Sequence, residues 1–399
     1  MSVFSALPLA PPDPVLGVTE AFNRDPDPAK VNLGVGVYQD EDGRVPVLDA
    51  VRQAQARLAD DPRPYAYLPI SGLPAYNEAV KRLVFSAAGD VVAQGRVVTI
   101  QALGGTGGLR VGAGLLALID PSARVLVSDP TWENHQAVFQ RAGLAVDSYR
   151  YLDAEAHRVD RAGMVADLAQ AAPGSVVVLH ACCHNPTGYE LSPADWDQVV
   201  AVCAEADLVP FLDMAYQGFG QGIVEDATAV AKFAAAGRPF LVATSFSKSF
   251  SLYGERVGAI SFVTTDADQA ERVLSQAKVV VRTLYSNPPT HGARLVTTVL
   301  GDRYLRAEWE NELSGMRDRI KGMRALLRSG LERAGVQRDL SYITDQTGMF
   351  SYSGLSLPQM ERLRRDFHIY GLDSGRLCVA ALNHGNIDAV VRAVAEVMA

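Results

Sequence analysis

The sequence predicts an α/β protein, in which helices cover a mostly parallel central sheet, with a second, smaller α+β domain. Through the middle of the chain, short apolar runs rich in β-branched residues alternate with segments of helical periodicity. Such runs are typical of strands buried on both faces, and their alternation with helices favours parallel pairing. After Asn287 the strand signal weakens and a long charged helical stretch follows. This change predicts the second domain.

The length of 399 residues also indicates more than one domain. Residues 1–12 are rich in proline and small apolar side chains, so we expect an extended N-terminal arm. Residues 46–315 are expected to form the large domain that contains the sheet. Residues 13–45 and 316–399 are expected to form the small domain together.

Individual elements follow from periodicity, capping residues and flanking turns. The expected strands are the runs 30–38, 97–100, 124–127, 175–179, 209–212, 239–244, 258–263, 348–353 and 376–380. The expected helices include one from Pro46 through Leu58, and others at 108–118, 193–206, 305–334 and from Ile387 onward. Ser192 is expected to cap the 193–206 helix, with Pro193 in its first turn.

Composition and charge exclude several classes of protein. The apolar content of 48% and charged content of 21% are typical of a soluble globular protein. A formal net charge of −8 argues against a nucleic-acid partner, because phosphates require a basic face. No apolar run is long enough to span a membrane, and we expect no signal peptide. The four cysteines lack metal-ligand spacing and indicate reduced thiols of a cytosolic chain, so we expect no metal.

Polar residues follow each expected strand of the large domain, and open parallel sheets bind ligands at these carboxyl ends. A glycine-rich turn at 104–108, which contains Thr106, offers backbone N–H groups and a helix N-terminus to a phosphate. Trp132 follows the next strand and could stack on a flat ring. Each feature has a structural alternative, since glycines also serve steric needs in turns and tryptophan also packs in cores.

Asp213 ends a buried strand, where an unpaired carboxylate would be very costly. A protonated pyridine nitrogen would satisfy it, and Tyr216 could reach a phenolic oxygen on the same ring. A helix cap or a structural ion pair is the alternative. Lys248 follows another strand, among hydroxyls and near Arg256. Burial and a nearby cation lower the pKa of a lysine, which then forms Schiff bases near neutral pH. A solvated surface lysine is the alternative here.

Together, a phosphate cradle, a stacking ring, a buried carboxylate and a lysine point to pyridoxal 5′-phosphate. The sequence resembles the class I aminotransferases of the aspartate and aromatic amino acid subfamily over essentially its whole length. The resemblance is carried by Asn185-Pro-Thr-Gly188, Asp213-Met-Ala-Tyr-Gln-Gly-Phe219, Ser245-Phe-Ser-Lys248 with Arg256, Tyr285-Ser-Asn-Pro-Pro289 and Gly375-Arg376. It implies the type I fold of pyridoxal-phosphate-dependent transferases and a cytoplasmic homodimer with shared active sites.

The resemblance also implies individual roles. Lys248 is expected to bind the cofactor covalently and to move the substrate Cα proton, with Asp213 and Tyr216 as the other catalytic residues. The implied cofactor-binding residues are Gly105, Thr106, Trp132, His135, Asn185, Asp213, Tyr216, Ser245, Lys248, Arg256 and, from the neighbouring subunit, Tyr67. The implied substrate-binding residues are Gly36, Trp132, Asn185, Arg376 for the α-carboxylate, and Arg282 for a side-chain carboxylate across the dimer.

Some positions depart from the subfamily pattern. Ala181, Ser249, Ser251 and Gly254 differ near the site, but none has an assigned chemical role. Less polar residues at Gln39, Val45, Ala66 and Leu284 predict a roomier wall that accepts aromatic side chains. We therefore expect transamination of phenylalanine, tyrosine and aspartate with 2-oxoglutarate.

The alternatives are a strict aspartate aminotransferase, another pyridoxal-phosphate enzyme such as a lyase or decarboxylase, and a non-enzymatic regulator that binds the cofactor. The paired arginines Arg282 and Arg376 favour transamination with a dicarboxylic partner. The regulator would need an added DNA-binding domain, for which the acidic chain leaves only a short proline-rich arm.

Overall fold

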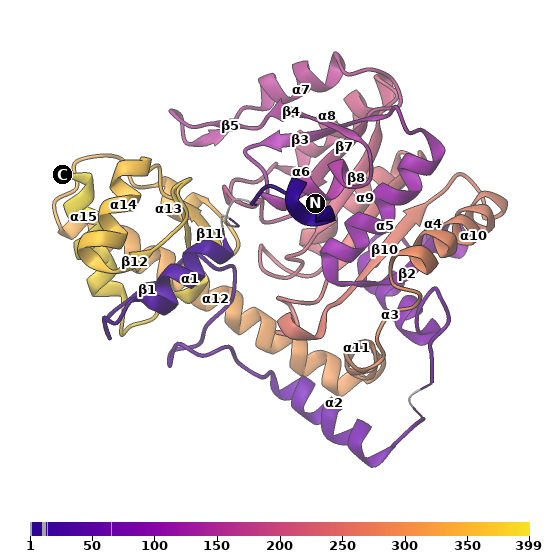
Figure 1. Cartoon of the computed structure of the whole chain (residues 1–399), viewed down its shortest axis with the longest axis horizontal. Coiled ribbons are helices and arrows are strands. Elements are labelled where there is room, and N and C mark those ends of the chain that lie inside the picture. Colours follow the sequence, from indigo (N-terminus) through magenta and orange to yellow (C-terminus); the bar gives the residue numbers. More distant parts are fainter. Residues whose placement is uncertain (1, 10–12, 14, 65) are drawn as a thin grey trace.

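The computed structural model describes residues 2–9, 13, 15–64 and 66–399, and it confirms the expected α/β architecture (Figure 1). The central sheet has seven strands in the order β2-β10-β9-β8-β7-β3-β4. Strand β10 (Val257–Val263) pairs antiparallel with β2 and with β9, whereas the other neighbours pair in parallel. The sheet is therefore mostly parallel, as the sequence predicts.

The remaining strands are β1 (Val31–Asn32), β2 (Val97–Leu103), β3 (Arg124–Asp129), β4 (Ala145–Arg150), β5 (Leu152–Asp153), β6 (Arg158–Val159), β7 (Val176–His180), β8 (Val209–Met214), β9 (Phe240–Ser245), β11 (Phe350–Tyr352), β12 (Ile369–Tyr370) and β13 (Arg376–Cys378). The α-helices are α1 (Leu16–Arg24), α2 (Asp49–Asp60), α3 (Pro74–Val84), α4 (Gly89–Ala93), α5 (Gly104–Ile119), α6 (Asn134–Gln140), α7 (Arg161–Ala169), α8 (Pro193–Glu205), α9 (Thr228–Ala235), α10 (Ala267–Leu284), α11 (His291–Gly301), α12 (Arg303–Arg333), α13 (Tyr342–Asp345), α14 (Leu357–Phe367) and α15 (Ile387–Met398). Short 3₁₀ helices are η1 (Val3–Ala6), η2 (Glu225–Ala227), η3 (Tyr253–Glu255) and η4 (Val379–Ala381).

The sheet is buried on both faces because its strands are apolar on both faces. In β7, Val176 and Val178 belong to one hydrophobic cluster, whereas Val177 and Leu179 belong to the other. This alternation follows from the two-residue period of a strand. Helix α5 packs against β2, β9 and β10, and α7 packs against β4. Ser192 caps α8 with a reciprocal capping box, as the sequence predicts.

The antiparallel direction of β10 has a simple cause. Only the polar loop 246–256 joins it to β9, and this loop contains a single 3₁₀ turn. A parallel return requires a crossover of a dozen or more residues, usually a helix, whereas a short connection returns the chain antiparallel. The loop that contains Lys248 is therefore held at both ends by adjacent strands.

The C-terminal part and the N-terminal segment pack together beside the large sheet (Figure 1). Strand β1 pairs in parallel with β12, and β11 pairs antiparallel with β13. Helix α12 contacts α2 and α11 at one side and α13 and α15 at the other, so it joins the two parts. We keep the predicted boundaries, 13–45 with 316–399 against 46–315, as a proposal.

Three local expectations were wrong in detail. The 30–38 strand shrinks to β1, because the side chain of Asn32 bonds the backbone N–H of Gly34 and turns the chain. The helix expected from Pro46 begins at Asp49. In the predicted arm, Val3–Ala6 forms a 3₁₀ turn capped by Ser2, although residues 1 and 10–12 lie outside the described part.

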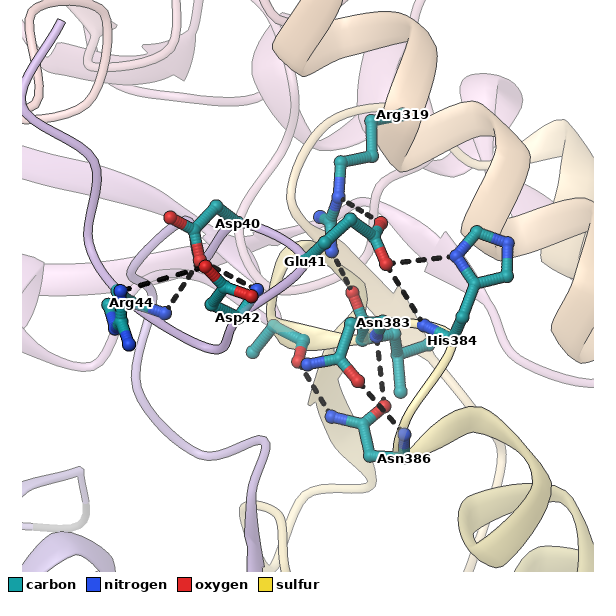
Figure 2. A network of polar contacts seen from close by, with 10 residues as sticks. Asp40, Glu41, Asp42, Arg44, Arg319, Asn383, His384 and Asn386 are labelled. Atoms are coloured by element: carbon teal, nitrogen blue, oxygen red, sulfur yellow. Dashed lines mark hydrogen bonds and ion pairs between the residues drawn. The ribbon is translucent and has the colours of Figure 1, made fainter.

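A polar network ties the segment after β1 to the C-terminal part (Figure 2). The Glu41 carboxylate accepts a 2.8 Å hydrogen bond from Arg319 Nε on α12 and a 3.2 Å bond from the backbone N–H of His384. The His384 Nδ1 atom lies 2.9 Å from the same carboxylate. Asn383 and Asn386 bond each other's backbone N–H and close the His384 loop. These contacts support grouping residues 13–45 with the small domain.

Within the described residues, we find no helix that combines the length and apolar character needed to cross a membrane.

Candidate active site

The carboxyl ends of the parallel strands surround a cavity of about 230 Å³. Strand register brings its residues together, since His180 of β7 lies opposite Asp213 of β8, and Asp213 lies opposite Ala243 of β9. Most of the residues that the sequence assigns to the site line this cavity: Gly36, Gly105, Thr106, Trp132, Asn185, Asp213, Tyr216, Ser245, Lys248, Arg256 and Arg376. Gly36 from the N-terminal segment and Phe350 and Arg376 from the C-terminal part line it together with the residues of the large sheet.

Lys248 projects into the cavity from the loop after β9. Its ammonium nitrogen lies 4.9 Å from the centre of the Tyr216 ring, and it forms no ion pair with any described residue. Burial lowers the pKa of Lys248 to about 8, and the Arg256 and Arg376 cations act in the same direction. The Asp213 carboxylate opposes this shift without cancelling it. A substantial fraction of Lys248 is therefore neutral, and nucleophilic, near physiological pH.

Asp213 is buried and paired with His135. Its Oδ2 atom lies 3.0 Å from His135 Nε2, and His135 Nδ1 lies 2.8 Å from the Thr131 hydroxyl. Burial raises the pKa of Asp213, but the hydrogen bond and charge of His135 outweigh it and leave that pKa below its usual value. Asp213 is thus an ionised carboxylate at the floor of the cavity. Burial lowers the pKa of the neighbouring His180 to about 3, so His180 is neutral.

The N-terminus of α5 forms the opposite end of the cavity together with Ser245 and Arg256. A Cβ atom on Gly105 would lie 3.2 Å from Ser245 Cβ, and one on Gly104 would lie 2.6 Å from Arg256 Nη2. These glycines therefore let Arg256 and Ser245 approach the backbone N–H groups of the helix end. Arg256 donates to the Ser247 hydroxyl at 3.3 Å and forms no ion pair with a described residue. A dianionic phosphate would complete this group of donors.

Arg376 lies at the small-domain side, 2% exposed. Its Nη1 donates to Asn185 Oδ1 at 2.9 Å and its Nη2 to the Gly34 carbonyl at 2.8 Å, while its buried Nε has no partner. The only described carboxylate within 4.0 Å is that of Glu133, at 3.9 Å. Neutral oxygens therefore hold most of this guanidinium, which leaves it able to bind a carboxylate from a ligand.

Three assigned residues do not line the cavity. His135 lies behind Asp213 and acts on it by contact. Tyr67 is 91% exposed and lines a separate cavity of about 700 Å³, together with Arg57, Arg294 and others. Arg282 is exposed near the end of α10, where it bonds the Ser286 hydroxyl. The expected roles of Tyr67 and Arg282 require a second subunit.

The cavity also contains residues to which sequence reasoning assigned no role. Val15, Leu109, Tyr253 and Phe350 are examples. The Tyr253 hydroxyl accepts a 2.9 Å bond from the backbone N–H of Tyr38, which links the Lys248 loop to the small domain. Tyr253 lies in the same polar stretch as Lys248, so its place in the sequence could have identified it as a cavity residue. Phe350 lies in a short apolar run whose sequence pattern is that of a buried core strand, so the sequence does not identify it as a cavity residue.

One group of potential metal ligands occurs among the described residues, formed by Cys182, Cys183 and Asp226. The Asp226 carboxylate already accepts backbone hydrogen bonds from Gly218 at 2.8 Å and Gly220 at 2.9 Å. The contact with Cys183, together with burial, raises the pKa of the Cys182 thiol well above its usual value. The Asp226 carboxylate therefore holds the loop after Tyr216 through these backbone hydrogen bonds.

The donor set fits pyridoxal phosphate: a lysine amine, a buried carboxylate for the ring nitrogen, and a phosphate cradle at a helix end. Residues 28–394 match the family model for aminotransferases of class I and II. The chain is 54% identical to the aspartate aminotransferase of Pseudomonas aeruginosa over 398 residues, which cover all of both chains.

Solved structures agree with this match. The aromatic-amino-acid aminotransferase from Burkholderia pseudomallei, covalently bound to pyridoxal phosphate, has 55% identity and a TM-score of 0.98 over all of both chains. The psychrophilic aromatic amino acids aminotransferase from Psychrobacter sp. B6, cocrystallised with aspartic acid, has 44% identity and a TM-score of 0.97 over 99% of both chains.

Proposed function

Because the chain belongs to the class I and II aminotransferase family, we propose that it transfers the amino group of aromatic and dicarboxylic amino acids to 2-oxoglutarate. It is a transaminase that depends on pyridoxal phosphate. One observation carries the proposal: a lysine of lowered pKa lies in the same cavity as an ionised aspartate and two arginines without full counter-charges. Transamination requires these groups together.

When bound, pyridoxal phosphate supplies a protonated aromatic ring that accepts electrons from the substrate Cα. Lys248 would hold its aldehyde carbon, and Asp213 would hold the proton on its ring nitrogen. Asn185 and Tyr216 would bind its phenolic oxygen, and Trp132 would stack on the ring. Gly105, Thr106, Ser245 and Arg256 would bind its phosphate.

Lys248 also moves the proton that transamination must relocate from the substrate Cα. Its amine accepts this proton only when neutral, and a pKa of about 8 places a useful neutral fraction near physiological pH. Asp213 must remain ionised throughout, and His135 secures this by its 3.0 Å contact. The buried side chains around the cavity restrict water, which strengthens the electrostatic effect of both residues.

Arg376 would bind the α-carboxylate of either substrate through its planar fork. We propose that Arg282 binds the side-chain carboxylate of aspartate, glutamate or 2-oxoglutarate in the site of the neighbouring subunit of a homodimer. The exposure of Arg282 and of Tyr67 in the single chain supports this assignment. We also propose a cytoplasmic location, which the four free cysteines support.

The proposed dual specificity rests on Gln39, Val45, Ala66 and Leu284. In the single chain none of them lines the cavity, and Val45 and Leu284 are 47% and 40% exposed. A partner subunit would therefore have to bring them to the site. Burying a phenylalanine side chain against a less polar wall contributes about 1.5–3 kcal/mol.

The test is a comparison of kcat/KM for aspartate, phenylalanine and tyrosine with 2-oxoglutarate. We expect the three values to lie within about a thousandfold of one another, which corresponds to about 4 kcal/mol in transition-state binding. Aromatic values below that range would leave the alternative, a strict aspartate aminotransferase. No turnover of any of the three would contradict the proposed function itself.

A further inference from the structure

Arg324 is a buried cation that no catalytic role explains. It lies on α12 and is 2% exposed, and it forms no ion pair with a described residue. Its Nη1 donates to the Ile343 carbonyl at 3.0 Å. Its Nη2 donates to the carbonyls of Gly348 at 2.9 Å and Thr347 at 3.3 Å, and also to that of Phe350. The Nε group has no partner.

This arrangement is costly, because a buried charge without a counter-ion loses its hydration. Burial lowers the pKa of Arg324 to about 10, so it stays charged at neutral pH. The arginine guanidinium spreads five N–H donors over three nitrogens, so it reaches carbonyls on different sides of one planar group. A lysine ammonium is a single point and cannot reach both Ile343 and Phe350 in the same way. The geometry therefore requires the guanidinium shape as well as the charge.

Of these carbonyls, Ile343 lies in α13, Thr347 and Gly348 lie in the turn that leads into β11, and Phe350 begins β11. The turn packs against the loop that contains Asn185. The backbone N–H of Thr347 donates to the Gly188 carbonyl at 2.7 Å. Gly348 has a φ of +77°, and a Cβ there would lie 2.6 Å from Cys183 Cβ. The turn therefore packs closely against the 183–188 loop, which also contains Asn185. Arg324 bonds the same turn through the carbonyls of Thr347 and Gly348.

The turn ends at Phe350, whose ring lies against the substrate-binding groups. The guanidinium carbon of Arg376 lies 4.3 Å from the ring centre, and the Tyr216 ring centre lies 5.9 Å away, edge to face. A Cβ on Gly36 would lie 2.7 Å from Phe350 Cζ. With contacts this close on three sides, a small shift of the Phe350 backbone would displace Arg376.

We propose that Arg324 is a positioning residue that sets the orientation of Arg376 through Phe350, and thereby sets the affinity for the substrate α-carboxylate. The inference rests on the proposed function, in which Arg376 binds that carboxylate. Arg324 itself touches neither substrate nor cofactor. It acts on carboxylate binding more than on the chemical step.

The test uses the holoenzyme variants Arg324→Lys and Arg324→Gln, with Leu331→Ala as the control. Leu331 is a fully buried residue of the same helix whose apolar side chain cannot donate a hydrogen bond to the turn, so we expect its truncation to lower stability. We expect Arg324→Lys to raise KM for aspartate, and the calorimetric Kd for succinate, by about tenfold, with kcat changed less than about threefold. Arg324→Gln should have a larger effect. Leu331→Ala should lower Tm and leave KM and Kd unchanged.

A double-mutant cycle separates positioning from general destabilisation. If Arg324 acts through Phe350, then Arg324→Lys should change the succinate Kd by less than about twofold in a Phe350→Leu background. An Arg324→Lys variant with wild-type KM and Kd would overturn the inference. The inference would also be overturned if Arg324→Lys raised the succinate Kd as much in the Phe350→Leu background as in wild type. If Arg324→Gln does not fold, the lysine variant decides.

Hydrogen exchange gives a readout that does not depend on the proposed function. The backbone N–H groups of Thr347 and Tyr352 are bonded within and around the turn. They should exchange at least about tenfold faster in Arg324→Lys than in wild type or Leu331→Ala. Unchanged exchange would overturn the inference. A wild-type enzyme that neither binds succinate nor transaminates would contradict the proposed function, while this measurement still decides the role of Arg324.

Discussion

Replacement of Asp213 by asparagine tests the electrostatic part of the mechanism. Asparagine has nearly the same shape and keeps an oxygen for the 3.0 Å contact with His135 Nε2, so the change removes mainly the negative charge. Asp213 is 6% exposed, and its pKa is below the usual value. The charge is therefore present at all pH values at which the enzyme would be assayed, and solvent screens it weakly.

The magnitude follows from that burial. A unit charge acting over about 4 Å at an effective dielectric constant of about 20 contributes about 4 kcal/mol. Removal of one preorganised electrostatic group typically costs about 2.7–4 kcal/mol in the transition state. We therefore expect kcat/KM of Asp213→Asn to fall by about two to three powers of ten.

The assay is steady-state turnover with saturating pyridoxal phosphate, alongside thermal unfolding. Asp195→Asn is the matched control, since Asp195 is also buried, at 7% exposure, but lies in the first turn of α8, where it bonds the N-cap residue Ser192 and Arg161 outside the cavity. Loss of this charge at the helix N-terminus, which also pairs with Arg161, should cost about 0.3–1 kcal/mol of unfolding free energy and leave kcat/KM unchanged. Asp213→Asn within about tenfold of wild-type kcat/KM would refute a direct electrostatic role for Asp213.

Three further predictions concern single features of the structure. In the cofactor-free protein, the extent of Lys248 labelling by an amine-reactive reagent, measured by peptide mass spectrometry, should rise with pH around an apparent pKa of about 8. An apparent pKa above about 9.5 would show that burial does not lower the pKa of Lys248. Mixing Arg282→Ala and Lys248→Ala chains should restore about a quarter of wild-type activity toward aspartate, because each hybrid dimer has one intact shared site; no recovery would exclude sharing. His368 lies 2.7 Å from the Asp25 carboxylate, and this hydrogen bond raises the pKa of His368. Its stabilisation is fully present below the unfolded pKa of about 6.5 and is lost as pH rises through the higher folded value, so His368→Gln should lower Tm more near about pH 5 than near about pH 9. An equal loss at both pH values would show that the contact is not charge-dependent.

The sequence predicted the large sheet and its strand-end residues well because both depend on local patterns. The run 175–179 is short and rich in valine, which favours a buried strand, and polar residues at the ends of neighbouring parallel strands meet at one edge of the sheet. Asp213 and Lys248 were found in this way. The antiparallel turn of β10 was not anticipated, although the absence of a helical crossover in 246–256 was a readable signal.

Contacts between distant segments could not be predicted in the same way. Arg324 lies in a charged helical stretch, where an arginine ordinarily faces water, and only tertiary packing buries it. Phe350 has the pattern of a core strand residue and yet lines the cavity. Tyr67 and Arg282 are exposed in the single chain, so their expected roles depend on a surface that the chain does not itself provide.

Lys248 is the residue that we propose binds the cofactor and performs the chemistry. Incubation of the protein with pyridoxal phosphate, borohydride reduction and mass spectrometry of the peptides measures this directly. We expect one pyridoxyl group per chain, on Lys248, and no stable attachment in a folded Lys248→Ala variant, which should also lose multiple-turnover transamination. A pyridoxyl group on another lysine, with Lys248 unmodified, would contradict this proposal.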